Sequence, residues 1–328
     1  MNKNWFEIVR KNQWLSALVT LFVLVTIGRT CSQLLSECES LPRFGSPWLL
    51  AAMLLAIAYR VTNAYGWALV LRSIGYQVDG KTATRIWLRA ESRRWLPGGI
   101  WGYASRAVQA KELGVSPATA SASMLLELIL TLLAALVVTI SVTFIYRQEL
   151  WNACNSLNQP AWLVGFGVVV VIAVMVGIIC CRKIITKNLN DLLIRFQALK
   201  SLSICARSMA IAFAFYVGMS LFNGLVTLAL LYSIPTQALS PAVIVAATSW
   251  AWIVGFFAVF APGGLIVREG VFAACLSPWV PYSTGFTLAI LCRLLQMVAE
   301  FICMIWVYSD CREWFARLFS GSVRQVAK

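Results

Sequence analysis

Two arginines, Arg106 and Arg268, each follow a copy of the tripeptide Pro-Gly-Gly in an otherwise mostly apolar chain. The copies are Pro97-Gly98-Gly99 and Pro262-Gly263-Gly264. Proline lacks an N–H group and glycine favours open backbone, so neither copy can continue a helix. A helix that starts after such a break points free N–H groups and its positive dipole end at the break, and an arginine adds a bidentate donor. We therefore expect each break to bind an anionic group, for which a phosphate is the best fit.

Further ionisable residues interrupt the long apolar segments. An ionisable side chain at the bilayer centre costs at least about 2.5–3.5 kcal/mol, so it needs a partner or a wet cavity. One interpretation is structural pairing, of Glu127 with Arg60 or of Arg293 with Glu269. The other is a binding site, in which arginines neutralise an anion and acids act as counter-ions, accept a headgroup amine or exchange protons. Counted together with Arg106, the arginines of this set outnumber the acids, which favours an anionic ligand. The residues concerned are Arg60, Glu127, Arg268, Glu269, Arg293 and Glu300.

The composition is that of a polytopic membrane protein. Hydrophobic residues make up 60% of the 328 positions and charged residues 12%, whereas soluble domains have about 45–50% and about 25%. The net charge of +14 comes from basic residues clustered in loops, which indicates a positive-inside topology rather than nucleic-acid binding. The chain has no histidine, which excludes a Ser-His-Asp triad and a histidine metal site. We identify no catalytic residue and expect no metal and no cofactor.

Apolar runs predict the elements that must position these residues. Two of the runs are interrupted by the Pro-Gly-Gly copies, and a polar, basic segment lies between the two halves. The predicted helical segments are 13–35, 47–71, 81–112 with a break at Pro97, 117–146, 160–181, 207–232, 241–260, 265–276 and 282–308.

The pattern predicts an all-α integral membrane domain over 1–328, with about six full spans and two re-entrant helix hairpins broken at Pro-Gly-Gly. Residues 1–150 and 160–310 form two half-repeats, and 182–206 is a basic cytoplasmic connector. Each half then crosses the membrane an odd number of times, so the halves are inverted. The basic loops place both termini in the cytoplasm. The segment 241–260 is also long enough to span the membrane. Cys38 and Cys154 both fall in predicted outer loops, and the sequence does not decide whether they form a disulfide.

Two motifs resemble the lysylphosphatidylglycerol synthase transmembrane-region family. The first is Trp95-Leu96-Pro97-Gly98-Gly99, followed by Arg106 and by Ser123-Met124-Leu125-Leu126-Glu127. The second is Ala261-Pro262-Gly263-Gly264-Leu265 with Val267-Arg268-Glu269-Gly270. The resemblance covers most of the chain and implies a flippase-like domain, which some members fuse to a soluble aminoacyl-transferase. We expect a stand-alone member without that domain and do not carry synthase activity over.

Together these features predict a lipid translocase of the cytoplasmic cell membrane. Its ligand would be an anionic phospholipid or a polyprenyl-phosphate-linked lipid, held by Arg106 and Arg268 from opposite hairpins. Two alternatives stay open. One is a membrane-embedded transferase that acts on a lipid phosphate, in which Glu127 or Glu269 could serve as the general base. The other is an accessory scaffold for an envelope glycosyltransferase. The oligomeric state is not predicted.

Overall fold

The computed structural model describes residues 46–91, 93, 101–148, 205–234, 239–258, 264 and 266–309. The predicted segments 13–35 and 160–181 lie outside the described residues, as do nearly all of the connector 182–206 and both Cys38 and Cys154. The same holds for the first Pro-Gly-Gly copy and for Pro262 and Gly263 of the second.

All regular secondary structure in the described part of the chain is helical, as predicted. Each helix begins and ends within a few residues of its expected limits, except that the segment before the first break ends at Glu91. The helices are α2 (Pro47–Ser73), α3 (Gly80–Glu91), α4 (Trp101–Gln109), the 3-10 helix η2 (Ala110–Leu113), α5 (Pro117–Ile145), α8 (Ala206–Leu231), α9 (Pro241–Phe257), α10 (Val267–Leu276) and α11 (Tyr282–Ser309).

Local sequence explains where several helices start. Helices α2, α5 and α9 each begin with proline preceded by serine, an order that favours a helix N-terminus because proline needs no N–H partner there. The Ser116 hydroxyl accepts a hydrogen bond from the Thr119 N–H at 3.1 Å. Before α3, the Thr82 hydroxyl and N–H both donate to Asp79, which holds the pKa of that carboxyl below its usual value.

Four described helices, α2, α5, α8 and α11, are long and apolar enough to cross a membrane. Helix α9 is apolar but has only 17 residues. At 1.5 Å per residue it is about 26 Å long, less than the roughly 30 Å of a bilayer core. The predicted segment 241–260 was long enough to span the membrane. Because α9 ends at Phe257, the helix itself is too short to do so.

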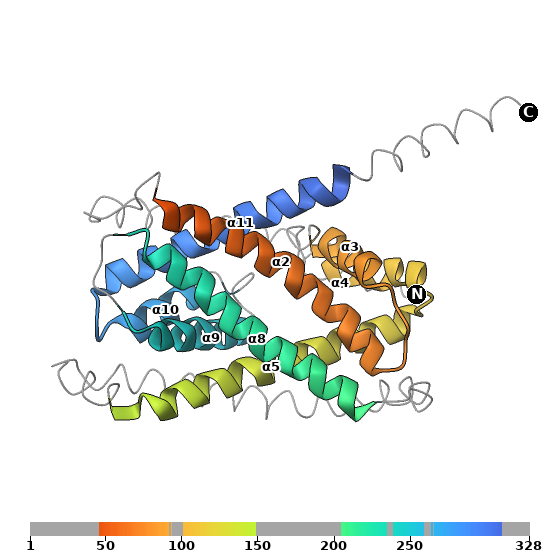
Figure 1. Ribbon diagram of the computed structural model, residues 1–328, viewed down its shortest axis with the longest axis horizontal. Coiled ribbons are helices and arrows are strands. Elements are labelled where there is room, and N and C mark those ends of the chain that lie inside the picture. Colours follow the sequence, from red (N-terminus) through yellow and green to blue (C-terminus); the bar gives the residue numbers. More distant parts are fainter. Residues whose placement is uncertain are drawn as a thin grey trace, which may run out of the picture.

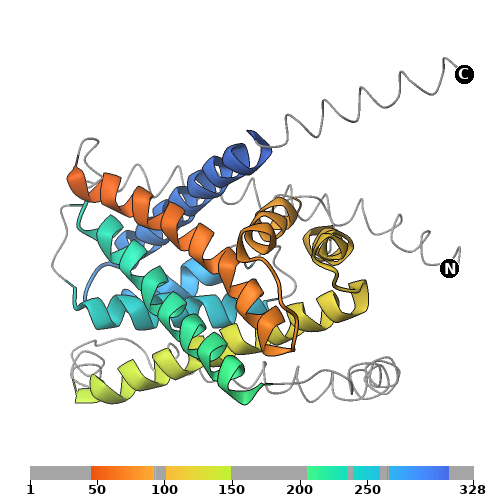
Figure 2. The same cartoon turned by 45° about the vertical axis from the view of Figure 1, so that its right-hand side comes forward.

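The helices pack in a reciprocal pattern (Figure 1). Helices α2 and α8 lie against each other near the middle of the molecule. Helix α5 packs against α8 and α9, while α11 packs against α2 and α3. In Figure 2, which is turned by 45° from the view of Figure 1, α5 and α11 again lie on opposite sides of the α2–α8 pair. The closing helix of each predicted half therefore contacts the helices of the other half.

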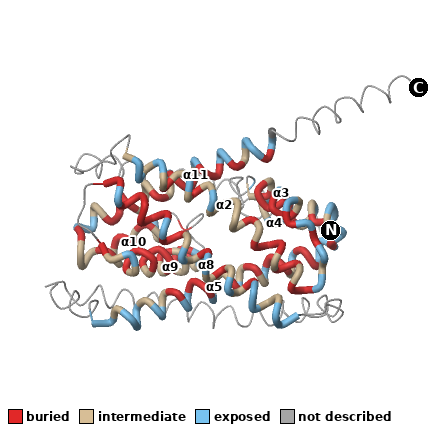
Figure 3. Tube along the Cα trace, in the orientation of Figure 1, coloured by how far each residue is buried: buried red, intermediate tan, exposed pale blue. Residues whose placement is uncertain are grey.

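Three apolar clusters fill the space between these helices. One joins α2 to α8, α9, α10 and α11, the second joins α2 to α3, η2, α5 and α11, and the third joins α2 to α5 and α8. Long apolar side chains remain exposed along α5 and α11, including Ile140, Phe144, Leu294 and Ile305. Exposed segments are visible on both helices in Figure 3. Such surfaces suit lipid contact, since lipid tails are as apolar as these side chains.

Candidate functional site

The first buried ion pair joins α4 to α5. Arg106 Nη2 lies 2.7 Å from Glu127 Oε2, and the two residues are only 6% and 8% exposed. The Trp87 indole N–H donates to Glu127 Oε1 at 3.0 Å, and the Arg106 guanidinium lies 5.1 Å from the centre of the Trp67 ring. The short helix after the first break is therefore tied to the next long helix by a charged contact.

A second pair of the same length joins α10 to α11. Arg293 Nη1 lies 2.7 Å from Glu269 Oε1, and Glu269 is only 4% exposed. Here the acid stands on the short helix and the arginine on the long one, the reverse of the Arg106–Glu127 pair. In each predicted half, an arginine–glutamate contact thus joins the short helix after the break to the long helix that follows it. The predicted pairing of Arg293 with Glu269 is confirmed.

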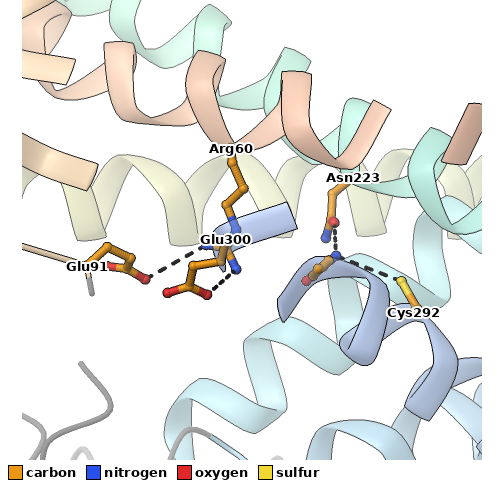
Figure 4. A network of polar contacts seen from close by, with 6 residues as sticks. Arg60, Glu91, Asn223, Cys292 and Glu300 are labelled. Atoms are coloured by element: carbon orange, nitrogen blue, oxygen red, sulfur yellow. Dashed lines mark hydrogen bonds and ion pairs between the residues drawn. The ribbon is translucent and has the colours of Figure 1, made fainter. Parts of the chain in front are cut away.

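A third cluster forms around Arg60 on α2. Its Nη2 lies 3.3 Å from Glu300 on α11 and its Nη1 lies 3.8 Å from Glu91 on α3. Figure 4 shows Arg60 reaching toward both carboxylates. The predicted pairing of Arg60 with Glu127 is wrong, because Arg106 pairs with Glu127. The sequence analysis also missed Glu91, which brings the acids in this set level with the arginines.

Buried amide and hydroxyl groups continue this polar zone toward α8. The Gln296 side-chain amide donates to Asn223 Oδ1 at 2.9 Å. Thr227 Oγ1 and Cys292 Sγ lie 3.3 Å apart, and Figure 4 places Asn223 and Cys292 near the Arg60 cluster. The sequence analysis did not select these residues, although Asn223 and Gln296 interrupt strongly apolar helices, a signal that indicates function inside a membrane.

These groups surround one cavity of about 230 Å³, lined by at least one residue from each described α-helix. A cavity needs only about 10–15 Å³ of this volume to hold one water molecule, so there is room for several waters or a small headgroup. Its charged lining residues are Arg60, Glu91, Arg106, Glu127 and Arg268. Tyr59, Tyr103 and Trp252 add aromatic surface. The cavity is thus concave, partly apolar and supplied with a few charges, as small-molecule sites are.

Arg268 differs from the other cavity arginines. It is partly buried on α10 and lines the cavity, yet no carboxylate of the described residues lies within ion-pair distance of it. It also lines a second, smaller cavity with Glu269 and Arg293. Two guanidinium groups and one carboxylate leave a net positive charge at this point. An anion entering the cavity would meet its unpaired positive charge here.

The backbone leading to Arg268 is tightly constrained. Gly264 has a φ of +68°, and an added Cβ would lie 2.6 Å from the Gly255 carbonyl oxygen of α9. Gly255 in turn packs against Arg268, whose Cβ would lie 2.9 Å from a Cβ on that glycine. Ile266 also has a positive φ of +68°, a rare conformation for a β-branched residue. The second break therefore fixes the place of Arg268 through backbone contacts that only glycine permits.

The structure brings most of the predicted site residues together. Arg60, Arg106, Glu127 and Arg268 line the large cavity, and Glu269 and Arg293 line the small one. Glu300 contacts the set through Arg60. Of the two predicted breaks only Gly264 lies among the described residues. Pro97, Gly98, Gly99, Pro262 and Gly263 lie outside them, so their predicted role in binding stays a prediction.

The fold and this polar interior define a multi-pass, all-helical membrane protein. The family model described as the lysylphosphatidylglycerol synthase TM region matches residues 13–302. The chain belongs to that family, as the two Pro-Gly-Gly motifs predicted. No match was found among curated proteins.

Proposed function

We propose that this protein is a lipid translocase that moves an anionic lipid across the membrane. The lipid is a phospholipid or a polyprenyl-phosphate-linked lipid. Its headgroup enters the 230 Å³ cavity while its tails remain in the bilayer. The observation that carries the proposal is Arg268, a cavity-lining arginine without a carboxylate partner among the described residues.

The charges of the cavity support a headgroup site rather than a purely structural network. Arg106 is held by Glu127, and Arg60 by Glu300 and Glu91. An arginine already paired in this way can still attract an anion but must share its charge. Arg268 has two donor edges to offer a phosphate in bidentate fashion. We therefore assign the first phosphate contact to Arg268 and supporting roles to Arg60 and Arg106.

The packing supports two inverted halves. Equivalent long helices α2 and α8 contact each other, and each closing helix contacts the entry helix of the opposite half, α5 with α9 and α11 with α3. A two-fold relation between halves would produce such reciprocal contacts. In this proposal α3–α4 and α9–α10 are re-entrant hairpins that enter from opposite sides. The length of α9 supports that assignment for the second hairpin.

Alternating access would follow from movement of one half against the other. The Arg60–Glu300 contact joins the two halves, since α2 belongs to the first half and α11 to the second. This contact would have to lengthen as the cavity changes its opening. The location in the cytoplasmic membrane, with both termini in the cytoplasm, is part of the same proposal.

The test is a headgroup-accessibility assay in sealed proteoliposomes. It uses labelled phosphatidylglycerol, lysyl-phosphatidylglycerol and a polyprenyl-phosphate sugar, each added to one leaflet. Wild type should move at least one of these lipids, and Arg268→Ala should reduce the rate at least tenfold. The matched control is Arg147→Ala, because Arg147 is exposed at the end of α5 and should leave the rate unchanged. Equal movement in wild type and Arg268→Ala would contradict the proposal.

A further inference from the structure

The smaller cavity beside Arg268 contains a buried acid in a position to bind a proton. It has a volume of about 30 Å³, more than the roughly 10–15 Å³ that a cavity needs to hold a water molecule. It shares Arg268 and Gln296 with the large cavity. The small cavity is therefore next to the place where we propose that the anion binds.

Glu269 is the acid that lines this cavity. Its Oε1 contacts Arg293 at 2.7 Å, whereas its Oε2 is fully enclosed and has no hydrogen-bond partner among the described residues. A buried carboxylate oxygen without a donor is costly to keep charged. Protonation of Oε2 removes the charge and supplies a hydroxyl that can donate instead. The geometry thus provides an oxygen at which a proton can be added without displacing Arg293 from Oε1.

The surroundings of Glu269 decide when a proton is favoured. Glu269 faces two positive charges, which favour its ionised form while no anion is bound. An anion on Arg268 cancels part of that positive field and adds a nearby negative charge, so it favours the protonated acid. By linkage, a proton on Glu269 then favours the anion to the same degree. The titratable or charged groups near Glu269 and Arg268 are Arg268, Arg293, Cys292 and Tyr59, while α8 and α9 present Thr227 and Thr248.

We propose that Glu269 takes up one proton when the anionic headgroup binds at Arg268 and releases it when the headgroup leaves. This inference rests on the proposed function, because it gives the translocase a proton as its coupling ion. The proton comes from water on the side where the headgroup enters and bonds to Glu269 Oε2. It returns to water on the side where the headgroup leaves.

The binding test is calorimetry on the purified full-length chain with dihexanoyl phosphatidylglycerol. This phosphodiester does not itself take up a proton near neutral pH, so any uptake belongs to the protein. Titrations at one pH in two buffers of different ionisation enthalpy give the number of protons bound. Wild type should take up about one proton per headgroup. Glu269→Gln should bind with no proton uptake, and Glu112→Gln, which alters an acid that is 51% exposed, should behave as wild type.

The outcomes separate the two proposals. Binding to wild type without proton uptake overturns the coupling and leaves the translocase proposal standing. Uptake that persists in Glu269→Gln overturns the assignment to Glu269. No binding of dihexanoyl phosphatidylglycerol to wild type overturns the phospholipid headgroup as the ligand of Arg268, and with it the coupling of that headgroup to a proton. The wild-type measurement decides even where the glutamine variant fails to fold.

Proteoliposomes provide a second measurement with a pH-sensitive dye inside. Lipid movement by wild type should be accompanied by a proton flux, and acidifying the side of entry by one pH unit should increase the rate several-fold. Glu269→Gln should lose this response to the gradient. A wild-type rate that is insensitive to the gradient, with no proton flux, would overturn the inference while still confirming lipid movement.

Discussion

Arg106 on α4 and Glu127 on α5 form a 2.7 Å ion pair that is almost entirely buried. It has a counterpart of equal length between Arg293 and Glu269, with the charges exchanged between the short and the long helix. The two pairs hold the short helices that follow the breaks. Arg268, next to Glu269, is left to face the cavity. The pairs thus explain how several charges can be kept inside an apolar protein while one arginine stays available.

The Arg106–Glu127 pair gives a first prediction about stability. Removing one partner leaves the other buried and unpaired, which costs about 3–5 kcal/mol. We expect Glu127→Ala to lower the free energy of unfolding by that amount, measured by denaturant titration in mixed micelles. The double variant Arg106→Met with Glu127→Leu should recover most of the loss, because apolar replacement of a buried pair is often neutral.

The control for this cycle is Glu112→Ala. Glu112 is an exposed acid that lies 3.8 Å from Arg89, and exposed pairs contribute about 0–1 kcal/mol. If the double variant were as unstable as Glu127→Ala or less stable, the two residues would not act as a pair.

A second prediction concerns the three-residue cluster around Arg60. Glu300 is deeply buried at 3.3 Å, whereas Glu91 is more exposed at 3.8 Å. Glu300→Gln should therefore destabilise the protein by about 3 kcal/mol, and Glu91→Gln by less than about 1 kcal/mol. Thermal unfolding of the purified variants checks the order. The reverse order would show that Arg60 is held mainly by α3.

The backbone at the second break gives a third prediction. Gly264→Ala places a Cβ 2.6 Å from the Gly255 carbonyl oxygen at a positive φ, so the segment before Arg268 must shift. We expect this variant to lose most lipid movement. Gly218→Ala is the matched control. Gly218 lies on α8, and a Cβ added there would have no atom within 4 Å. Equal transport by the two variants would show that the geometry of the break does not matter.

Much of this architecture was predictable from the sequence. Hydrophobic runs predicted the helices, since this signal is local. The position of Arg268 after the second break also followed from local chemistry. The partner of each charge did not, because Arg106 and Glu127 come together only through the packing of α4 on α5.

Glu91 illustrates the same limit. It lies among several arginines in a segment that reads as a solvated basic face, and only the packing of α3 beside α2 brings it to Arg60. Asn223 could have been found from sequence, because a side-chain amide in the middle of an apolar run is a functional signal.

The most direct test of the account is whether an anionic headgroup binds at Arg268. Native mass spectrometry on delipidated protein would compare phosphatidylglycerol with diacylglycerol of the same acyl chains, added in equal amounts. Wild type should retain phosphatidylglycerol at least tenfold over diacylglycerol, and Arg268→Ala should lose this preference while Arg147→Ala keeps it. Arg268→Lys, which retains the charge without the bidentate donor, should fall between them. Equal retention of phosphatidylglycerol by wild type and Arg268→Ala would contradict the central claim.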